Sequence, residues 1–148
     1  MYERILVAID NSSTSDKALD EAIKLAMVHK ATLRLVHVVD TAMLDVDNGG
    51  LVSVHEVVQA LRQSGESLLK QAQARVRKAD IAVETSLLET LGVTRIATEI
   101  VEAAKKWPAD LIVLGTHGRR GFVHLLLGSV AEDVVRMAAT PVLLIRGE

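Results

Sequence analysis

Cysteine is absent from this chain of 148 residues, which also contains only three aromatic residues. Without cysteine the protein can have no disulfide, no thiolate nucleophile and no cysteine-based metal site, as is common in a reducing compartment. Tyr2, Trp107 and Phe122 are too few to form the stacking platforms that bind single-stranded nucleic acid. The formal net charge of −2 gives no reason to expect a nucleic acid or a membrane surface as a partner.

Long apolar runs are missing as well. No run approaches the roughly 18 apolar residues of a membrane-spanning helix. The chain starts MYERILVAID and enters a strand pattern at once, without the features of a secretory signal, so we expect a cytoplasmic protein. The length, with 49% hydrophobic and 24% charged residues, predicts a single folded domain over residues 1–148.

Short apolar runs alternate with segments of helical spacing. Strands are predicted at 5–9, 33–39, 81–87, 111–114 and 142–145, and helices at 18–26, 53–79, 96–104 and 130–138. Continuous short runs are typical of strands buried on both faces, and their alternation with helices indicates a parallel sheet with helices on both sides. We therefore predict an α/β fold of the doubly wound type, flavodoxin-like or Rossmann-like, with residues 81–87 at an edge because their polarity alternates.

Two single residues within these elements carry expectations of their own. Gly65 in the long second helix indicates a bend or a point of close packing. His37 lies inside the second predicted strand, where a packed or hydrogen-bonded structural histidine is more common than a ligand.

The most informative stretch is residues 110–130, DLIVLGTHGRRGFVHLLLGSV. Its buried strand ends at Gly115, Gly118 and Gly128 follow, and Ser129 is placed to cap the next helix. Glycines let main-chain N–H groups approach a ligand closely, and the N-terminus of a helix attracts anions. The combination predicts a phosphate-binding loop, although each glycine alone is more typical of an ordinary turn.

The spacing Gly115-x2-Gly118-x9-Gly128-Ser129 closely resembles the pattern G-x2-G-x9-G-[S/T] of the ATP-binding branch of the universal stress proteins. The resemblance extends over nearly the whole chain, including RILVAIDNSSTS, LRLVHVVD and AEDVVRMAATPVLLIR. It implies a five-stranded sheet of order 3-2-1-4-5. Ligands of such open sheets bind beyond the carboxyl ends of the strands, where the order reverses. In this chain, the resemblance puts the reversal between the strand that ends at Asp10 and the strand that ends at Gly115.

The resemblance also implies which residues bind the nucleotide. Those expected at the adenosine are Ala8, Ile9, Asp10 and the main chain of Val38, which would hydrogen-bond the adenine edge. Those expected at the ribose and phosphates are Leu114, Gly115, Gly118, Gly128, Ser129 and Val130. Taken alone, Asp10 and the serines after it are typical of a helix cap.

Three cations lie in or beside the glycine-rich loop. His117, Arg119 and Arg120 could pair with phosphate oxygens, and the alternative is a set of solvated loop charges. A second loop, residues 41–52, breaks periodicity and contains Asn-Gly-Gly, so it is either a lid or a passive connector.

Three functions fit these observations. The first is a stress-response regulator that binds ATP or another adenine nucleotide, with Mg²⁺ at the phosphates left open, and that dimerises through the apolar strand Val142-Ile145. The second is a slow ATP-hydrolysing or adenylyl-transferring enzyme in which Asp10 holds a divalent metal. No Walker lysine, Ser-His-Asp order or HExxH motif supports it. The third is a dimeric interaction module with a vestigial pocket, against which the intact glycines argue.

Overall fold

The computed structural model describes residues 1–41, 53–90, 95–117 and 127–147. The elements are β1 (Arg4–Ala8), α1 (Ser13–His29), β2 (Thr32–Val39), α2 (Val54–Lys78), β3 (Val83–Glu89), α3 (Ile96–Lys106), β4 (Leu111–Gly115), α4 (Ser129–Met137) and β5 (Val142–Ile145). The strands form a parallel sheet in the order β3-β2-β1-β4-β5. The predicted α/β fold and strand order are confirmed.

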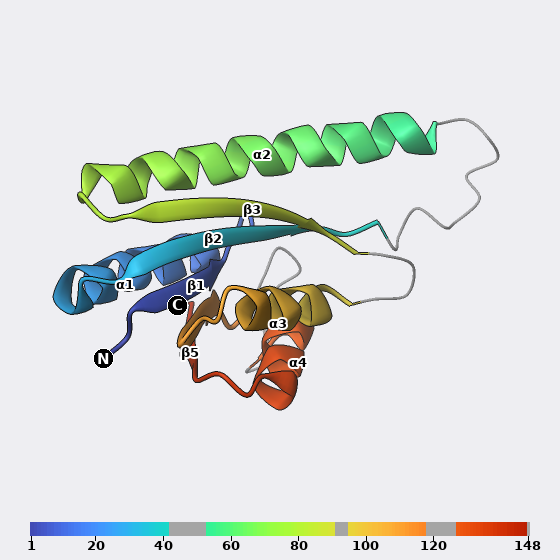
Figure 1. The fold of residues 1–148 in the computed structure, drawn as a ribbon. Helices are drawn as coiled ribbons and strands as arrows, with labels where there is room; N and C mark the ends of the chain where they lie inside the picture. The colour runs from blue at the N-terminus through green and yellow to red at the C-terminus, as the bar shows by residue number, and fades with distance from the viewer. Residues whose placement is uncertain (42–52, 91–94, 118–126, 148) are drawn as a thin grey trace.

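The sheet lies between two layers of helices (Figure 1). Helices α1 and α2 cover one face, and α3 and α4 cover the other. In β1, Ile5 and Val7 pack under α1 and α2, while Leu6 packs under α3 and α4, and all three are fully buried. Complete burial of such side chains contributes about 1.5–3 kcal/mol each, which explains why the run is apolar without interruption.

Strand β3 lies at one edge of the sheet, as its alternating sequence predicts. It begins at Val83, two residues later than the alternation indicates, because the chain is still turning out of α2. Asp80 has a φ of 58°, in the left-handed region, and ladder pairing with β2 starts only where Leu33 N–H donates to the carbonyl of Ala82.

Helix α2 runs through Gly65 and packs tightly there. A Cβ atom at Gly65 would lie 2.7 Å from Cδ1 of Leu87 and 2.9 Å from Cδ2 of His37, closer than carbon atoms normally approach. The expectation of a close packing point is confirmed: the missing side chain lets α2 lie directly on β2 and β3.

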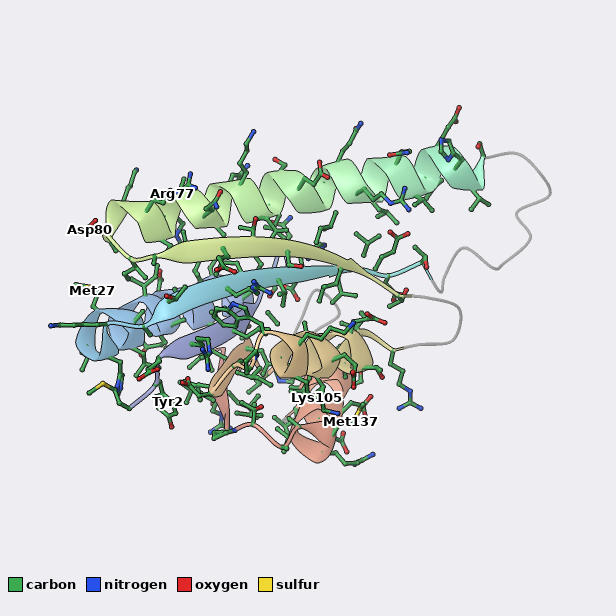
Figure 2. All side chains as sticks on the ribbon, in the orientation of Figure 1. Tyr2, Met27, Arg77, Asp80, Lys105 and Met137 are labelled. Atoms are coloured by element: carbon green, nitrogen blue, oxygen red, sulfur yellow. The ribbon has the colours of Figure 1, made fainter. Side chains whose placement is uncertain are left out.

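The outward faces of the helices carry both charged and apolar side chains. Figure 2 shows the side chain of Arg77 on the outside of α2, and those of Met27 and Met137 on the outside of α1 and α4. None of the helices in the described ranges has both the length and the apolar character needed to cross a membrane.

Candidate functional site

The strand order reverses between β1 and β4, and it is at such a reversal that the carboxyl ends of the strands in open α/β sheets form a ligand-binding crevice. The two strands pair as neighbours up to Val7 and Val113. Beyond that point β1 leads into α1 on one face, and β4 leads toward α4 on the other. The diverging turns place Asp10 and Gly115 at adjacent strand ends, where ligands of such sheets bind.

Asp10 is held in the turn between β1 and α1 by two hydrogen bonds, and a third caps the helix beside it. Oδ1 of Asp10 accepts from Ser12 N–H at 2.8 Å, and the N–H of Asp10 donates to Oγ of Ser15 at 2.9 Å. Ser12 is the N-cap of α1, and its Oγ accepts from Ser15 N–H at 3.1 Å. Oδ2 of Asp10 has no hydrogen bond to any residue in the described ranges. The turn therefore fixes the carboxylate and leaves one oxygen for a ligand.

Gly115 brings the end of β4 into contact with the start of α1. A Cβ atom at Gly115 would lie 2.6 Å from Cγ2 of Thr14 and 3.2 Å from its main-chain carbonyl carbon. Thr14 is itself buried. Only glycine permits this approach, so Gly115 lets the end of β4 lie directly against the first turn of α1.

The N-terminus of α4 is attached to the same strand end. Thr116 N–H donates to the carbonyl of Ile145 at 2.9 Å, and Gly128 N–H donates to the carbonyl of Thr116 at 2.6 Å. The prediction that Ser129 caps this helix is wrong: Gly128 is the N-cap, Ser129 is the first helical residue, and no side chain of the described residues caps the end. The first N–H groups of a helix have no intrahelical partner, so those of Ser129 and Val130 remain for an anion.

Val38 presents its main chain at the open end of β2. Alternate residues of a strand direct their N–H and C=O groups to opposite neighbours, and Val36 faces β1, since its carbonyl accepts from Ile9 N–H at 2.8 Å. The N–H and C=O groups of Val38 therefore point to the same side as those of Val36, beyond the last residue of β1. In the described part of the chain no strand partner takes its N–H or its carbonyl.

The remaining candidate residues are placed as follows. Ile9 and Leu114 are buried in the cores on opposite faces of the sheet, and Ala8 is half-buried. Their side chains therefore pack into the protein next to the carboxyl ends of β1 and β4. His117 lies beside Gly128, with Nδ1 3.8 Å from the position that a Cβ of Gly128 would take. Gly118, Arg119 and Arg120 lie outside the described residues, as does the loop after Thr41.

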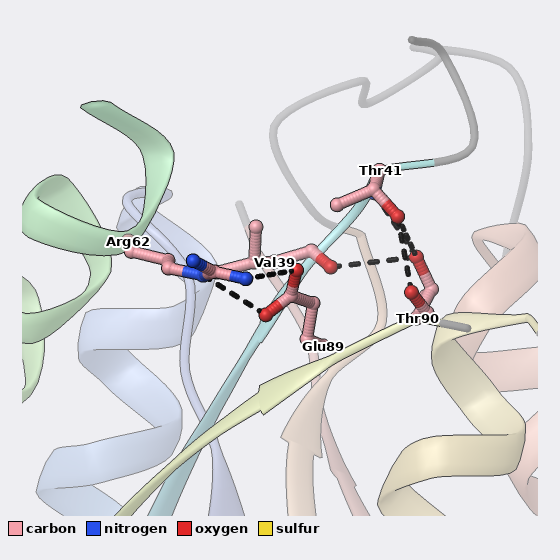
Figure 3. A network of polar contacts seen from close by, with 5 residues as sticks. All are labelled: Val39, Thr41, Arg62, Glu89 and Thr90. Carbon is pink, nitrogen blue, oxygen red and sulfur yellow. Dashed lines mark hydrogen bonds and ion pairs between the residues drawn. The ribbon is translucent and has the colours of Figure 1, made fainter. Parts of the chain in front are cut away.

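A polar cluster that the sequence did not reveal joins the ends of β2 and β3 (Figure 3). Thr90 is 2% exposed, and its Oγ1 accepts from Thr41 N–H at 3.0 Å and lies 3.4 Å from the carbonyl of Val39. Beside it, Arg62 of α2 donates to both carboxylate oxygens of Glu89, at 3.1 and 3.0 Å. This hydrogen bonding and the charge of Glu89 raise the pKa of Arg62. The cluster ties α2, β2 and β3 together at the carboxyl ends of the two strands.

Substitution of Thr90 by valine is expected to destabilise the fold by about 1–3 kcal/mol, because it keeps the shape of the side chain but leaves Thr41 N–H without an acceptor. The urea midpoint should fall with an unchanged m value. Thr41→Val is the matched control, since it removes the hydroxyl contacts to the carbonyl and Oγ1 of Thr90 but keeps the bond from Thr41 N–H, and it should cost less. Equal losses for the two variants would contradict this account of the cluster.

Together, the fold and the crevice define an open-sheet α/β protein with a candidate ligand site at its strand reversal. The universal stress protein family model matches residues 1–146, and the chain belongs to this family. Universal stress protein MJ0531 of Methanocaldococcus jannaschii is 36% identical to it over 146 residues, which cover 99% of this chain and 83% of the relative.

Two solved structures show the same architecture. The crystal structure of a universal stress protein family member from Burkholderia pseudomallei is 38% identical, with a TM-score of 0.80, and the match covers 97% of this chain and 96% of that one. The universal stress protein of Archaeoglobus fulgidus in complex with dAMP is 26% identical, with a TM-score of 0.67, and the match covers 97% and 98%.

Proposed function

We propose that this protein is a stress-response regulator that binds an adenine nucleotide, ATP or AMP, in the crevice formed by β1, β2 and β4. The observation that carries the proposal is the convergence of unpaired polar groups at one end of the sheet. Val38 offers a main-chain donor and acceptor, Asp10 offers a carboxylate oxygen, and α4 offers its first N–H groups. A cytoplasmic location belongs to the same proposal.

These groups match the three parts of a nucleotide. The edge of adenine needs one donor and one acceptor, the ribose hydroxyls donate to a carboxylate, and the phosphates accept from the N-terminus of a helix. A relative in the same family forms a complex with dAMP, which supports an adenine nucleotide as the ligand.

Nucleotide content and binding test the proposal directly. Mass spectrometry of the denatured, freshly purified protein should detect an adenine nucleotide, and equilibrium dialysis of stripped protein should give micromolar dissociation constants for AMP or ATP. Repeating the dialysis with Mg²⁺ and with a chelator determines whether the ion accompanies the phosphates. Absence of any adenine-nucleotide binding in the presence of Mg²⁺ would refute the proposal.

An enzymatic role for the same crevice is the second candidate. In the described ranges there is no group of three or more His, Asp or Glu side chains that could hold a metal ion, so Asp10 would share a divalent ion with the phosphates. A turnover assay separates the regulator from the enzyme. If the Asp10→Ala variant still binds ATP but no longer hydrolyses it, the result favours the enzyme. The third candidate, an interaction module with a vestigial pocket, predicts no nucleotide binding at all.

We propose further that the protein is a homodimer through β5. This strand lies at the other edge of the sheet, and its four apolar residues are half-exposed. The carbonyl of Pro141 accepts from Ile112 of β4, and that of Ile145 accepts from Thr116 just after β4. The main chain of Val142 and Leu144 therefore faces outward, where it is open to pairing.

The expected result is a dimeric mass in solution at micromolar concentration. Because a partner strand would occupy the outward-facing N–H groups, the amide of Leu144 should be protected from hydrogen exchange in the dimer and lose this protection on dilution. A monomeric mass at tens of micromolar, or a fast-exchanging Leu144 amide in the dimer, would contradict this interface.

A further inference from the structure

His37 is packed and hydrogen-bonded, as predicted for a structural histidine, and its partner is the main chain just past the end of β1. Its ring lies over Gly65, and its Nδ1 is 2.9 Å from the carbonyl oxygen of Ile9. A carbonyl can only accept, so Nδ1 carries the hydrogen and donates it. The ring therefore links β2 to the chain just past the end of β1.

This bond falls where the ladder between β1 and β2 stops. Ile9 N–H makes the last ladder bond, to the carbonyl of Val36. In a continuing parallel ladder the next bond would run from Val38 N–H to the carbonyl of Ile9. Within the described residues that bond is not formed, and the carbonyl of Ile9 is taken by the imidazole instead.

We propose that His37 determines the base specificity of the crevice by holding the Ile9 carbonyl away from the main chain of Val38. The inference rests on the proposed adenine-nucleotide site. With Ile9 held by His37, Val38 presents a free N–H and a free carbonyl side by side. Adenine complements this pair, because its N1 accepts and its 6-amino group donates. Hypoxanthine reverses both polarities, since its N1 donates and its 6-oxo group accepts.

Gly65 is part of the same arrangement. A Cβ atom there would lie 2.9 Å from Cδ2 of His37 and 3.5 Å from Nε2, so the bare helix backbone makes the room in which the ring reaches Ile9. His37 is a positioning residue: its ring hydrogen-bonds the main chain of Ile9, whereas the base contacts the main chain of Val38.

The test compares binding of AMP and IMP by the wild-type protein, His37→Leu and His37→Asn. Asparagine carries an N–H donor near the place of Nδ1, whereas leucine has none. Wild type should prefer AMP, and His37→Leu should lose up to about tenfold of this preference, as expected for one hydrogen bond, whereas His37→Asn should retain most of it. A purely structural role would weaken AMP and IMP binding equally.

A measurement on the wild-type protein covers the case in which His37→Leu does not fold. In the nucleotide-free protein the Val38 amide should exchange with solvent much faster than the Val36 amide, and AMP should protect it while IMP does not. An unchanged preference in His37→Leu, or a Val38 amide that is protected without nucleotide, overturns the role of His37. Failure of the wild type to bind either nucleotide overturns the proposed function instead.

Discussion

Substitution of Asp10 by alanine is expected to weaken AMP binding by about 10- to 100-fold, because a hydrogen bond to a charged group contributes about 1.5–3 kcal/mol. The carboxylate is fixed just past the end of β1 by the bond from Ser12 N–H to its Oδ1, and Oδ2, which has no hydrogen bond within the described ranges, is the proposed acceptor for a ribose hydroxyl. Isothermal titration of nucleotide-free protein measures the loss.

Alanine also removes the bond to Ser12, so a second variant separates binding from folding. Asp10→Asn keeps an oxygen that accepts from Ser12 N–H but lacks the charge; its stability should stay near that of wild type while AMP binding weakens about tenfold. Asp16→Asn is the charge-matched control, because Asp16 lies in the first turn of α1 and its exposed carboxylate pairs with Arg75. Wild-type affinity in Asp10→Asn would show that the carboxylate does not contact the ligand.

A methyl group at Gly115 is expected to lower the free energy of unfolding by about 1–3 kcal/mol and to weaken nucleotide binding with it. The added Cβ would lie 2.6 Å from Cγ2 of Thr14, so α1 and the end of β4 must move apart. That movement widens the crevice between Asp10 and the N-terminus of α4. Denaturant unfolding and AMP titration of Gly115→Ala measure the two effects.

The companion substitution is Thr14→Ser, which removes Cγ2 and keeps the hydroxyl group. Alone, Thr14→Ser should lower the free energy of unfolding by roughly 0.8 kcal/mol, the contribution of one buried methylene-sized group. In the double variant, Thr14→Ser should restore part of the stability that Gly115→Ala loses. The coupling free energy expected for two groups in contact is about 0.5–3 kcal/mol. Recovery should be partial, because the carbonyl carbon of Thr14 would still lie 3.2 Å from the new atom. Additive losses would contradict the contact.

The fold was predictable because burial on both faces leaves a clear pattern. The continuous run at Ile5 to Ile9 indicates a doubly covered strand, and β1 is buried from both sides. The alternation at residues 81–87 indicates an edge strand, and β3 is one. Strand order did not follow from periodicity; it came from the family resemblance, and the structure confirms it.

The polar connections were less predictable, because they depend on which distant residues meet. Ser129 has the chemistry of a cap, yet the chain enters α4 one residue earlier, where Gly128 donates to the carbonyl of Thr116. Thr90 is an ordinary threonine in the sequence, and its partner Thr41 is 49 residues away. His37 was expected to be hydrogen-bonded, and it is, but its partner could be known only once β1 and β2 were aligned.

The most direct test of the nucleotide site is an amide NMR titration of the stripped protein with AMP. The account predicts saturable shifts, with one micromolar dissociation constant, at the amides of Val38, Ser129 and Val130. Val38 lies on β2, whereas Ser129 and Val130 lie at the start of α4, so one ligand must contact both elements to shift all three amides. Absence of saturable shifts, or shifts confined to the outer surface of α2 and β3, would contradict a nucleotide site at the carboxyl ends of β1, β2 and β4.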